Sequence, residues 1–252
     1  MNNPRDRLAT ILLILLIGSA ILVTVLPHAL AVSGAVLGNL STETMGVGTG
    51  GEFTSARGTI TTAIINATQQ DQRWKGYVGN VSGILTLDDT NGNTLYDWSM
   101  VGFTLTGEVY ASRENALLFT GVECAENATV ATEQTLLNMT GFESDSINYT
   151  FANLNHSAFT VGTQPILENT CRAVALFVND TRQTQNTTAD FQEILLQDAT
   201  GNLIYAAIIN NGAYGFDGAL DGNRYDFQLI VAESDINEAP TTYYFYTEIA
   251  SA

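Results

Sequence analysis

The sequence predicts a mainly β protein, most simply an antiparallel β-sandwich preceded by a hydrophobic N-terminal helix. Apolar residues make up 45% of the 252 residues and charged residues only 14%, which excludes a disordered chain. The chain has a single lysine, Lys75, and is rich in Thr, Val, Tyr, Phe and Gly, a composition that favours strands and turns over helices. Many short apolar segments are bounded by turn residues, as expected for strands.

The predicted strands follow one another closely along the chain. In 101–106, Val101, Phe103 and Leu105 would face one side of a sheet and the intervening residues the other. The stretch 126–155 lacks this alternation, and we expect one or two short helices in it, around 131–139 and 144–151. The predicted strands are 59–65, 81–87, 94–100, 102–111, 115–122, 157–162, 173–179, 193–197, 203–209, 224–232 and 242–249.

One turn sequence occurs twice. The segment 87–96, LDDTNGNTLY, aligns with 196–205, LQDATGNLIY, and each copy has apolar runs on both sides. Gly92 and Gly201 can adopt the positive φ that a tight hairpin requires, and the preceding aspartates can accept hydrogen bonds from the turn amides. The repeat suggests two related lobes, 58–165 and 166–252, with a single sandwich containing two hairpins as the alternative.

The same oxygen-rich turns are weak candidates for a calcium site. The first copy places its glycine too early for an EF-hand loop, and the second copy has lost several of the oxygens. A second Gly-Asn turn, DGALDGNRYD at 217–226, has similar chemistry. We therefore expect no metal or cofactor, with calcium as the alternative. The candidate ligands would be Asp88, Asp89, Asn91, Asp217, Asp221 and Asp226.

The N-terminus predicts export. The basic segment MNNPRDR precedes residues 8–26, which carry no charged side chain and as a helix come close to the ~30 Å thickness of the hydrocarbon layer. The positive flank would hold the N-terminus in the cytoplasm, so that the rest of the chain is extracellular. Ala29-Leu30-Ala31 has the form of a cleavage site, so residues 1–31 are either a signal peptide or a membrane anchor. The Gly-, Ser- and Thr-rich residues 32–57 are predicted to be a flexible spacer.

Two further features fit an extracellular location. Cys124 and Cys171 are expected to form a disulfide, because exported proteins fold in an oxidising compartment. N-glycosylation sequons are more frequent than random order of the Asn, Ser and Thr residues would produce, and none lies in the last 64 residues. The nine sites are Asn39, Asn66, Asn80, Asn127, Asn138, Asn148, Asn155, Asn179 and Asn186.

The charge and the absence of known catalytic motifs restrict the function. A net charge of −17 with nine Lys and Arg argues against nucleic acid as a partner. The sequence has no nucleophile elbow, Walker loop, HExxH or CxxC motif. We expect His156 to be a surface histidine and Trp74 and Trp98 to be core residues rather than a sugar-stacking surface. A secreted glycoside hydrolase using Asp88 with Asp89, or Asp217 with Asp221, is the less favoured enzymatic alternative.

Several segments resemble a family of uncharacterised, exported, sequon-rich proteins of archaea. They are RWKGYVGNVSG (73–83), LYDW (95–98), GEVYAS (107–112), DSINYTF (145–151) and RYDFQLIV (224–231). The resemblance implies an extracytoplasmic β-rich domain and brings no catalytic residues. The sequence differs from archaeal pilin precursors, which keep a basic residue and a Gly just before the hydrophobic run, whereas this chain has DRLAT there.

Together these features predict a non-enzymatic cell-surface glycoprotein with a structural or adhesive role in an archaeal envelope. It would be anchored through residues 8–26 or assembled into a surface layer or filament with itself or other envelope proteins. The aromatic strand 241–249 could pair with a neighbouring copy, although closing its own sheet is the favoured role. The alternative is an extracellular carbohydrate- or calcium-binding module.

Overall fold

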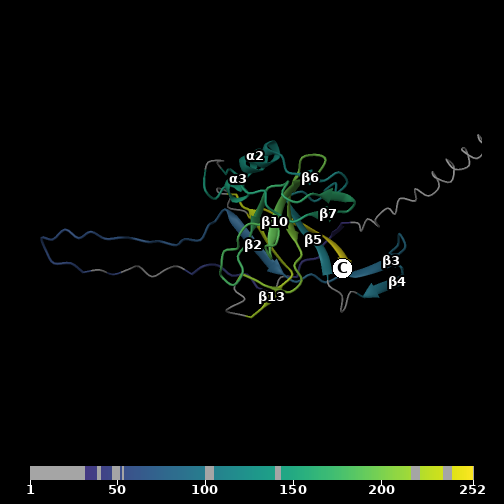
Figure 1. The fold of residues 1–252 in the computed structure, drawn as a ribbon, viewed down its shortest axis with the longest axis horizontal. Coiled ribbons are helices and arrows are strands. Elements are labelled where there is room, and N and C mark those ends of the chain that lie inside the picture. Colours follow the sequence, from purple (N-terminus) through teal and green to yellow (C-terminus); the bar gives the residue numbers. More distant parts are fainter. Residues whose placement is uncertain are drawn as a thin grey trace, which may run out of the picture.

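The computed structural model describes residues 32–38, 41–46, 52, 54–99, 105–139, 143–216, 222–234 and 240–251. The described residues form a mainly β protein in which every strand pair is antiparallel (Figure 1). This confirms the mainly β, antiparallel part of the predicted fold class. Within these ranges no helix is both long and apolar enough to span a bilayer. The hydrophobic run 8–26 lies outside the described residues.

A seven-stranded central sheet forms the middle of the molecule. Its order is β1-β15-β5-β11-β10-β6, and β9 also pairs with β10. The strands are β1 (Ser33–Gly34), β15 (Tyr244–Ser251), β5 (Leu105–Ser112), β11 (Leu203–Ile208), β10 (Gln192–Gln197), β6 (Glu123–Cys124) and β9 (Ala173–Ala175). β5, from the predicted first lobe, lies between β15 and β11 from the second, so the two segments share one sheet.

The central sheet is covered on both faces, which explains why every residue of β10 is buried. One face packs against β14 (Phe227–Ala232), β2 (Trp74–Gly79), α2 (Asn127–Leu136) and α3 (Ile147–Thr150). The opposite face is covered by β7 (Phe159–Val161), β8 (Gln164–Ile166) and irregular segments. The first core includes Val109, Leu195, Tyr205, Leu229, Val231 and Phe245, and the second includes Tyr110, Ile166, Cys171, Ile194, Leu196 and Ile204.

The two short helices occur where they were predicted. α3 begins after Ser146, whose side chain accepts a hydrogen bond from the Tyr149 amide. α2 is followed by Asn138, which has a φ of 55° and so terminates the helix in the left-handed region that asparagine tolerates.

The hairpin of β3 (Ile84–Asp88) and β4 (Thr94–Ser99) stands apart from these layers. In Figure 1 it lies beside the C-terminal end of the chain, to the side of the central sheet. Its strands pair only with each other among the described strands, as do β12 (Ala213–Tyr214) and β13 (Arg224–Tyr225).

Three sequence-based expectations are wrong in detail. Residues 59–65 are exposed coil, because none of the described strands pairs with them. Residues 115–122 are irregular; they pack as a loop over the sheet, where Phe119 contacts Tyr110 and Tyr246. Within the predicted spacer 32–57, Ser33 and Gly34 form β1.

The C-terminal strand closes its own sheet. β15 pairs with β5 along its whole length, and on its other side Ser33 and Gly34 pair with Thr247 and Tyr246. The middle of this edge is therefore already occupied by the same chain, which confirms the favoured role of 241–249.

Candidate functional site

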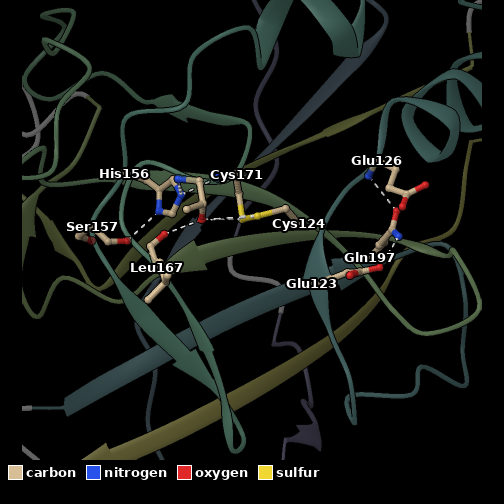
Figure 2. Close-up of a disulfide and its surroundings, with 9 residues drawn as sticks. Glu123, Cys124, Glu126, His156, Ser157, Leu167, Cys171 and Gln197 are labelled. Atoms are coloured by element: carbon tan, nitrogen blue, oxygen red, sulfur yellow. Dashed lines mark hydrogen bonds between the residues drawn. A yellow bond between two sulfur atoms is a disulfide. The ribbon is translucent and has the colours of Figure 1, made fainter.

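The predicted disulfide is formed. Cys124 on β6 is bonded to Cys171, with Cα atoms 4.9 Å apart, and Figure 2 shows how it joins the edge of the central sheet to the loop after β8. The closed loop spans 47 residues and contains both helices. Residues 124–171 are therefore tied to the sheet at both ends.

His156 organises the main chain next to this disulfide, so the expectation of a surface histidine is wrong. The ring is completely buried. Its Nε2 accepts hydrogen bonds from the amides of Thr170 (3.2 Å) and Cys171 (2.9 Å), and Nδ1 lies 2.7 Å from the Ser157 carbonyl oxygen (Figure 2). These contacts require the neutral tautomer with the proton on Nδ1, and burial lowers the pKa of His156. With both nitrogens engaged by backbone, the ring has none left for a catalytic triad.

Gln197, from β10, accepts hydrogen bonds at the N-terminus of α2, where the N-cap residue provides none with its own side chain. Glu126 precedes the helix, and no side-chain bond from it caps the first turn. Instead Gln197 Oε1 accepts hydrogen bonds from the Glu126 amide (2.8 Å) and the Thr129 hydroxyl (2.6 Å), while its Nε2 donates to Glu123 (Figure 2). The Gln197 side chain thereby holds the start of the helix against the sheet.

A shallow, open depression of about 750 Å³ lies beside the disulfide. Arg172, one of its lining residues, donates from Nη2 to Oδ1 of Asn127 (2.8 Å) and from Nη1 to the Phe151 carbonyl (3.2 Å). Asn127 is a sequon asparagine, so the depression lies at a predicted glycosylation site rather than at a cluster of catalytic groups.

The sequon asparagines lie at the surface. Asn39 is outside the described residues; of the other eight, Asn148 is half-buried and seven are exposed. The exposed ones are Asn66, Asn80, Asn127, Asn138, Asn155, Asn179 and Asn186. At Asn186, Oδ1 accepts from the amide (2.8 Å) and the hydroxyl (2.9 Å) of Thr188, the threonine of its own sequon. Because the turn uses only Oδ1 of Asn186, Nδ2, the atom that would carry a sugar, takes no part in these two hydrogen bonds.

The two repeated turns have the same hydrogen-bond chemistry. Asp89 Oδ1 accepts from the amides of Asn91 and Asn93 (both 2.8 Å), and Asp198 Oδ1 accepts from those of Thr200 and Asn202 (2.9 and 3.0 Å). Gly92 and Gly201 have φ values of 80° and 82°. The hairpin interpretation of both copies is therefore confirmed.

The candidate metal ligands are placed as follows. The Asp89 carboxylate accepts hydrogen bonds from Asn91 and Asn93 of its own turn, and Asp88 accepts one from the Thr86 hydroxyl. Asp226 is buried and accepts from the amides of Val81 (2.9 Å) and Gly212 (3.0 Å), so it ties two loops together. Asp217 and Asp221 lie outside the described residues. Across the described ranges no group of three or more His, Cys, Asp or Glu side chains is arranged to hold an ion.

Sequence reasoning missed a buried pair of glutamates. Glu108 on β5 is directly opposite Glu248 on β15, and the hydroxyl of Tyr110 lies 3.3 and 3.4 Å from their Oε2 atoms. Glu248 also accepts from the Gly162 amide (2.7 Å). Burial and the neighbouring Glu248 charge raise the pKa of Glu108 to about 8, and burial raises the pKa of Glu248. The pair therefore holds a proton at neutral pH.

Glu193 is a second buried carboxyl group, between β10 and β14. It is completely buried; Oε2 accepts from the Ile230 amide at 2.8 Å, while Oε1 has no hydrogen-bond partner among the described residues. Burial raises its pKa well above the usual range. Because this carboxyl group lies inside the core, its role is to join β10 to β14 through the hydrogen bond with Ile230.

The two tryptophans differ. Trp74 is partly buried, donates from Nε1 to the Asp145 carbonyl (2.7 Å) and packs near Phe151, which confirms it as a core residue. Trp98 is 50% exposed on β4 and makes an edge contact with Tyr96 at 5.0 Å. The expectation that Trp98 is a core residue is therefore wrong, because its hairpin does not pack into the sandwich.

Comparison with known proteins gives no relative: no family model, no curated protein and no solved structure matches this chain.

Proposed function

We propose that the protein is a non-enzymatic, N-glycosylated cell-surface protein with a structural or adhesive role in an archaeal cell envelope. In this proposal residues 8–26 hold it in the membrane, and the β domain beginning at β1 lies outside the cell. The resemblance of segments such as 73–83 and 224–231 to exported, sequon-rich archaeal proteins supplies the archaeal setting.

The surface position of the sequons is the observation that carries the proposal. Asparagine is glycosylated only where solvent and the transferase can reach it. None of the eight described sequon asparagines is buried, and the buried strands β10, β11 and β14 contain none. The disulfide adds support, because such bonds persist in oxidising compartments.

Intact-mass measurement and peptide mapping of the native protein from envelope fractions test this proposal. We expect a mass above that of the polypeptide remaining after any N-terminal cleavage, glycopeptides that include Asn186, and no free thiol at Cys124 or Cys171. Recovery of the native protein from the cytosol, unglycosylated and with both thiols reduced, would overturn it.

A carbohydrate-binding module is the second candidate, favoured by the exposed Tyr96 and Trp98 rings on one hairpin. A sugar that stacked there would raise the melting temperature and change the Trp98 emission. A melting curve that is unmoved by a panel of glycans and by calcium would remove the binding-module candidate.

A further inference from the structure

The β3–β4 hairpin carries an apolar face with no covering layer among the described residues. The register pairs Leu85 with Trp98 and Leu87 with Tyr96, so these four side chains lie on one face. Leu87, Tyr96 and Trp98 are 50%, 58% and 50% exposed. An isolated two-stranded hairpin of this kind is marginally stable in water, and exposed apolar faces mark interaction sites. No sequon occurs in 84–99, so the hairpin itself carries no predicted glycan to cover the face.

The hairpin and β1 both contact the last half of β15. β1 is antiparallel to β15, with Gly34 opposite Tyr246 and Ser33 opposite Thr247, so the chain read backward from Gly34 to Ser33 runs toward Ser251. Gly83, just before β3, lies so close to Ile249 that an added Cβ would overlap its side chain. Ser33 at the start of β1 and Gly83 just before β3 therefore lie within a few residues of each other along the last half of β15, and Figure 1 shows β3 and β4 beside the C-terminal end.

The connection between the hydrophobic run and the sheet is short. Seven residue steps separate Leu26 from Ser33, which at full extension reach at most about 24 Å. The five residues of β3 extend about 17 Å from its base. If residues 8–26 are embedded, the hairpin is within reach of the bilayer surface.

We propose that the Leu85, Leu87, Tyr96 and Trp98 face docks onto the lipid surface in which residues 8–26 are embedded, and so fixes the orientation of the β domain to the membrane. This proposal rests on the membrane-anchored role proposed above. Tyr and Trp are the side chains that favour the membrane–water interface, because one part of the ring system is apolar and another donates hydrogen bonds.

Charge restricts the kind of lipid. Residues 84–99 contain Asp88, Asp89 and Asp97 and no Lys or Arg, in a chain of net charge −17. Anionic headgroups would repel this hairpin, so docking depends on apolar contact and is stronger on zwitterionic than on anionic bilayers. Added salt leaves docking on zwitterionic bilayers unchanged and strengthens it on anionic ones.

The test uses the full chain reconstituted in phosphatidylcholine liposomes that contain brominated lipid. The chain has two tryptophans; we expect Trp98 emission to be blue-shifted and quenched, and the residual emission of Trp74 to be unaffected. The W98F variant should therefore lose the quenchable fraction.

Leu87→Ser and Ile84→Ser form a matched pair. Both side chains are exposed, and Ile84, which pairs with Ser99, faces the other side of the hairpin from Leu85 and Leu87. Leu87→Ser should reduce the quenching of Trp98 severalfold, whereas Ile84→Ser should leave it unchanged. Equal effects of the two variants would contradict the proposal.

The outcomes separate the docking proposal from the anchored role. Protein that does not float with liposomes contradicts the anchor itself. Protein that floats while Trp98 stays accessible to aqueous acrylamide and unquenched by lipid contradicts docking alone. Protection of Trp98 that depends on protein concentration without lipid, or on an added glycan, would assign the face to a second copy or to a carbohydrate and overturn the proposal.

Discussion

At the scale of single residues, the Glu108–Glu248 pair gives the protein a defined pH response. The pKa of Glu108 is about 8 in the folded protein and close to 4.5 when unfolded. Between these values the folded state binds more protons than the unfolded state, so this group lowers the free energy of unfolding as the pH rises from about 4.5 through 8.

Replacing Glu108 with glutamine removes that dependence. We expect Glu108→Gln to raise the free energy of unfolding at pH 8 by on the order of 2 kcal/mol and to leave it nearly unchanged at pH 4.5. Urea unfolding at both pH values measures this, with Glu114→Gln, at an exposed position, as the control. An equal effect at the two pH values would show that Glu108 does not titrate in this range.

His156 acts in the opposite direction. Its pKa is lowered by burial, while in the unfolded chain it is about 6.5, so the unfolded state binds the additional proton. Stability from this group is present above pH 6.5 and is lost as the pH falls through the folded pKa.

We expect His156→Gln to cost on the order of 2 kcal/mol at pH 7.5, because the amides of Thr170 and Cys171 lose a well-placed acceptor. The difference between wild type and variant should shrink at pH 5, where only the wild type is penalised by protonation. Thermal unfolding at both pH values gives the comparison, and a constant difference would mean that the pKa of His156 is the same in the folded and unfolded states.

At the scale of elements, the twin turns allow a direct comparison of one motif in two settings. Asp198 is buried and also accepts from the Leu118 amide, whereas Asp89 stands on the exposed hairpin. Burial alone would raise the pKa of Asp198, but hydrogen bonds from Asn202 and Thr200 outweigh it and hold the pKa at about 2.

Asp198→Ala should therefore lower the free energy of unfolding by about 2 kcal/mol at pH 7, since it leaves several buried donors unsatisfied. Asp89→Ala should have a clearly smaller effect on global unfolding. Chemical denaturation of both variants measures the contrast, and equal losses would indicate that the β3–β4 hairpin unfolds together with the sandwich.

Local sequence was sufficient to predict some elements and not others. The turns at Gly92 and Gly201 were predictable because turn chemistry is local. The strand predicted at 59–65 has the right side chains, but a strand also needs a neighbour, and pairing partners are not encoded locally. The exposure of Trp98 and the burial of His156 were missed for the same reason, since burial depends on which segments pack together.

Residue types in the sequence likewise predicted only part of the candidate site. The Cys124–Cys171 bond followed from the count of two cysteines and the predicted export. The facing of Glu108 and Glu248 depends on the register between strands 140 residues apart, and nothing in either local sequence signals it.

At the scale of the whole molecule, the disulfide holds the helical segment against the sheet. It closes a loop of 47 residues that includes the sequons Asn127, Asn138, Asn148 and Asn155. We expect the Cys124→Ser, Cys171→Ser double variant to be less stable by about 4 kcal/mol on the chain-entropy model. Guanidinium unfolding of the variant and of reduced wild type should agree; stability equal to the oxidised protein would contradict the prediction.

The order of strands in the central sheet has a consequence for biogenesis. β1 and β5 both pair with β15, so neither can complete its hydrogen bonds until β15 has been synthesised. Until then β5 has unpaired edges, because its two neighbours in the sheet, β11 and β15, both come later in the sequence. In the glycosylated form proposed above, sugars added early to Asn127, Asn138 or Asn148 would shield this intermediate from its neighbours until β15 pairs with β5.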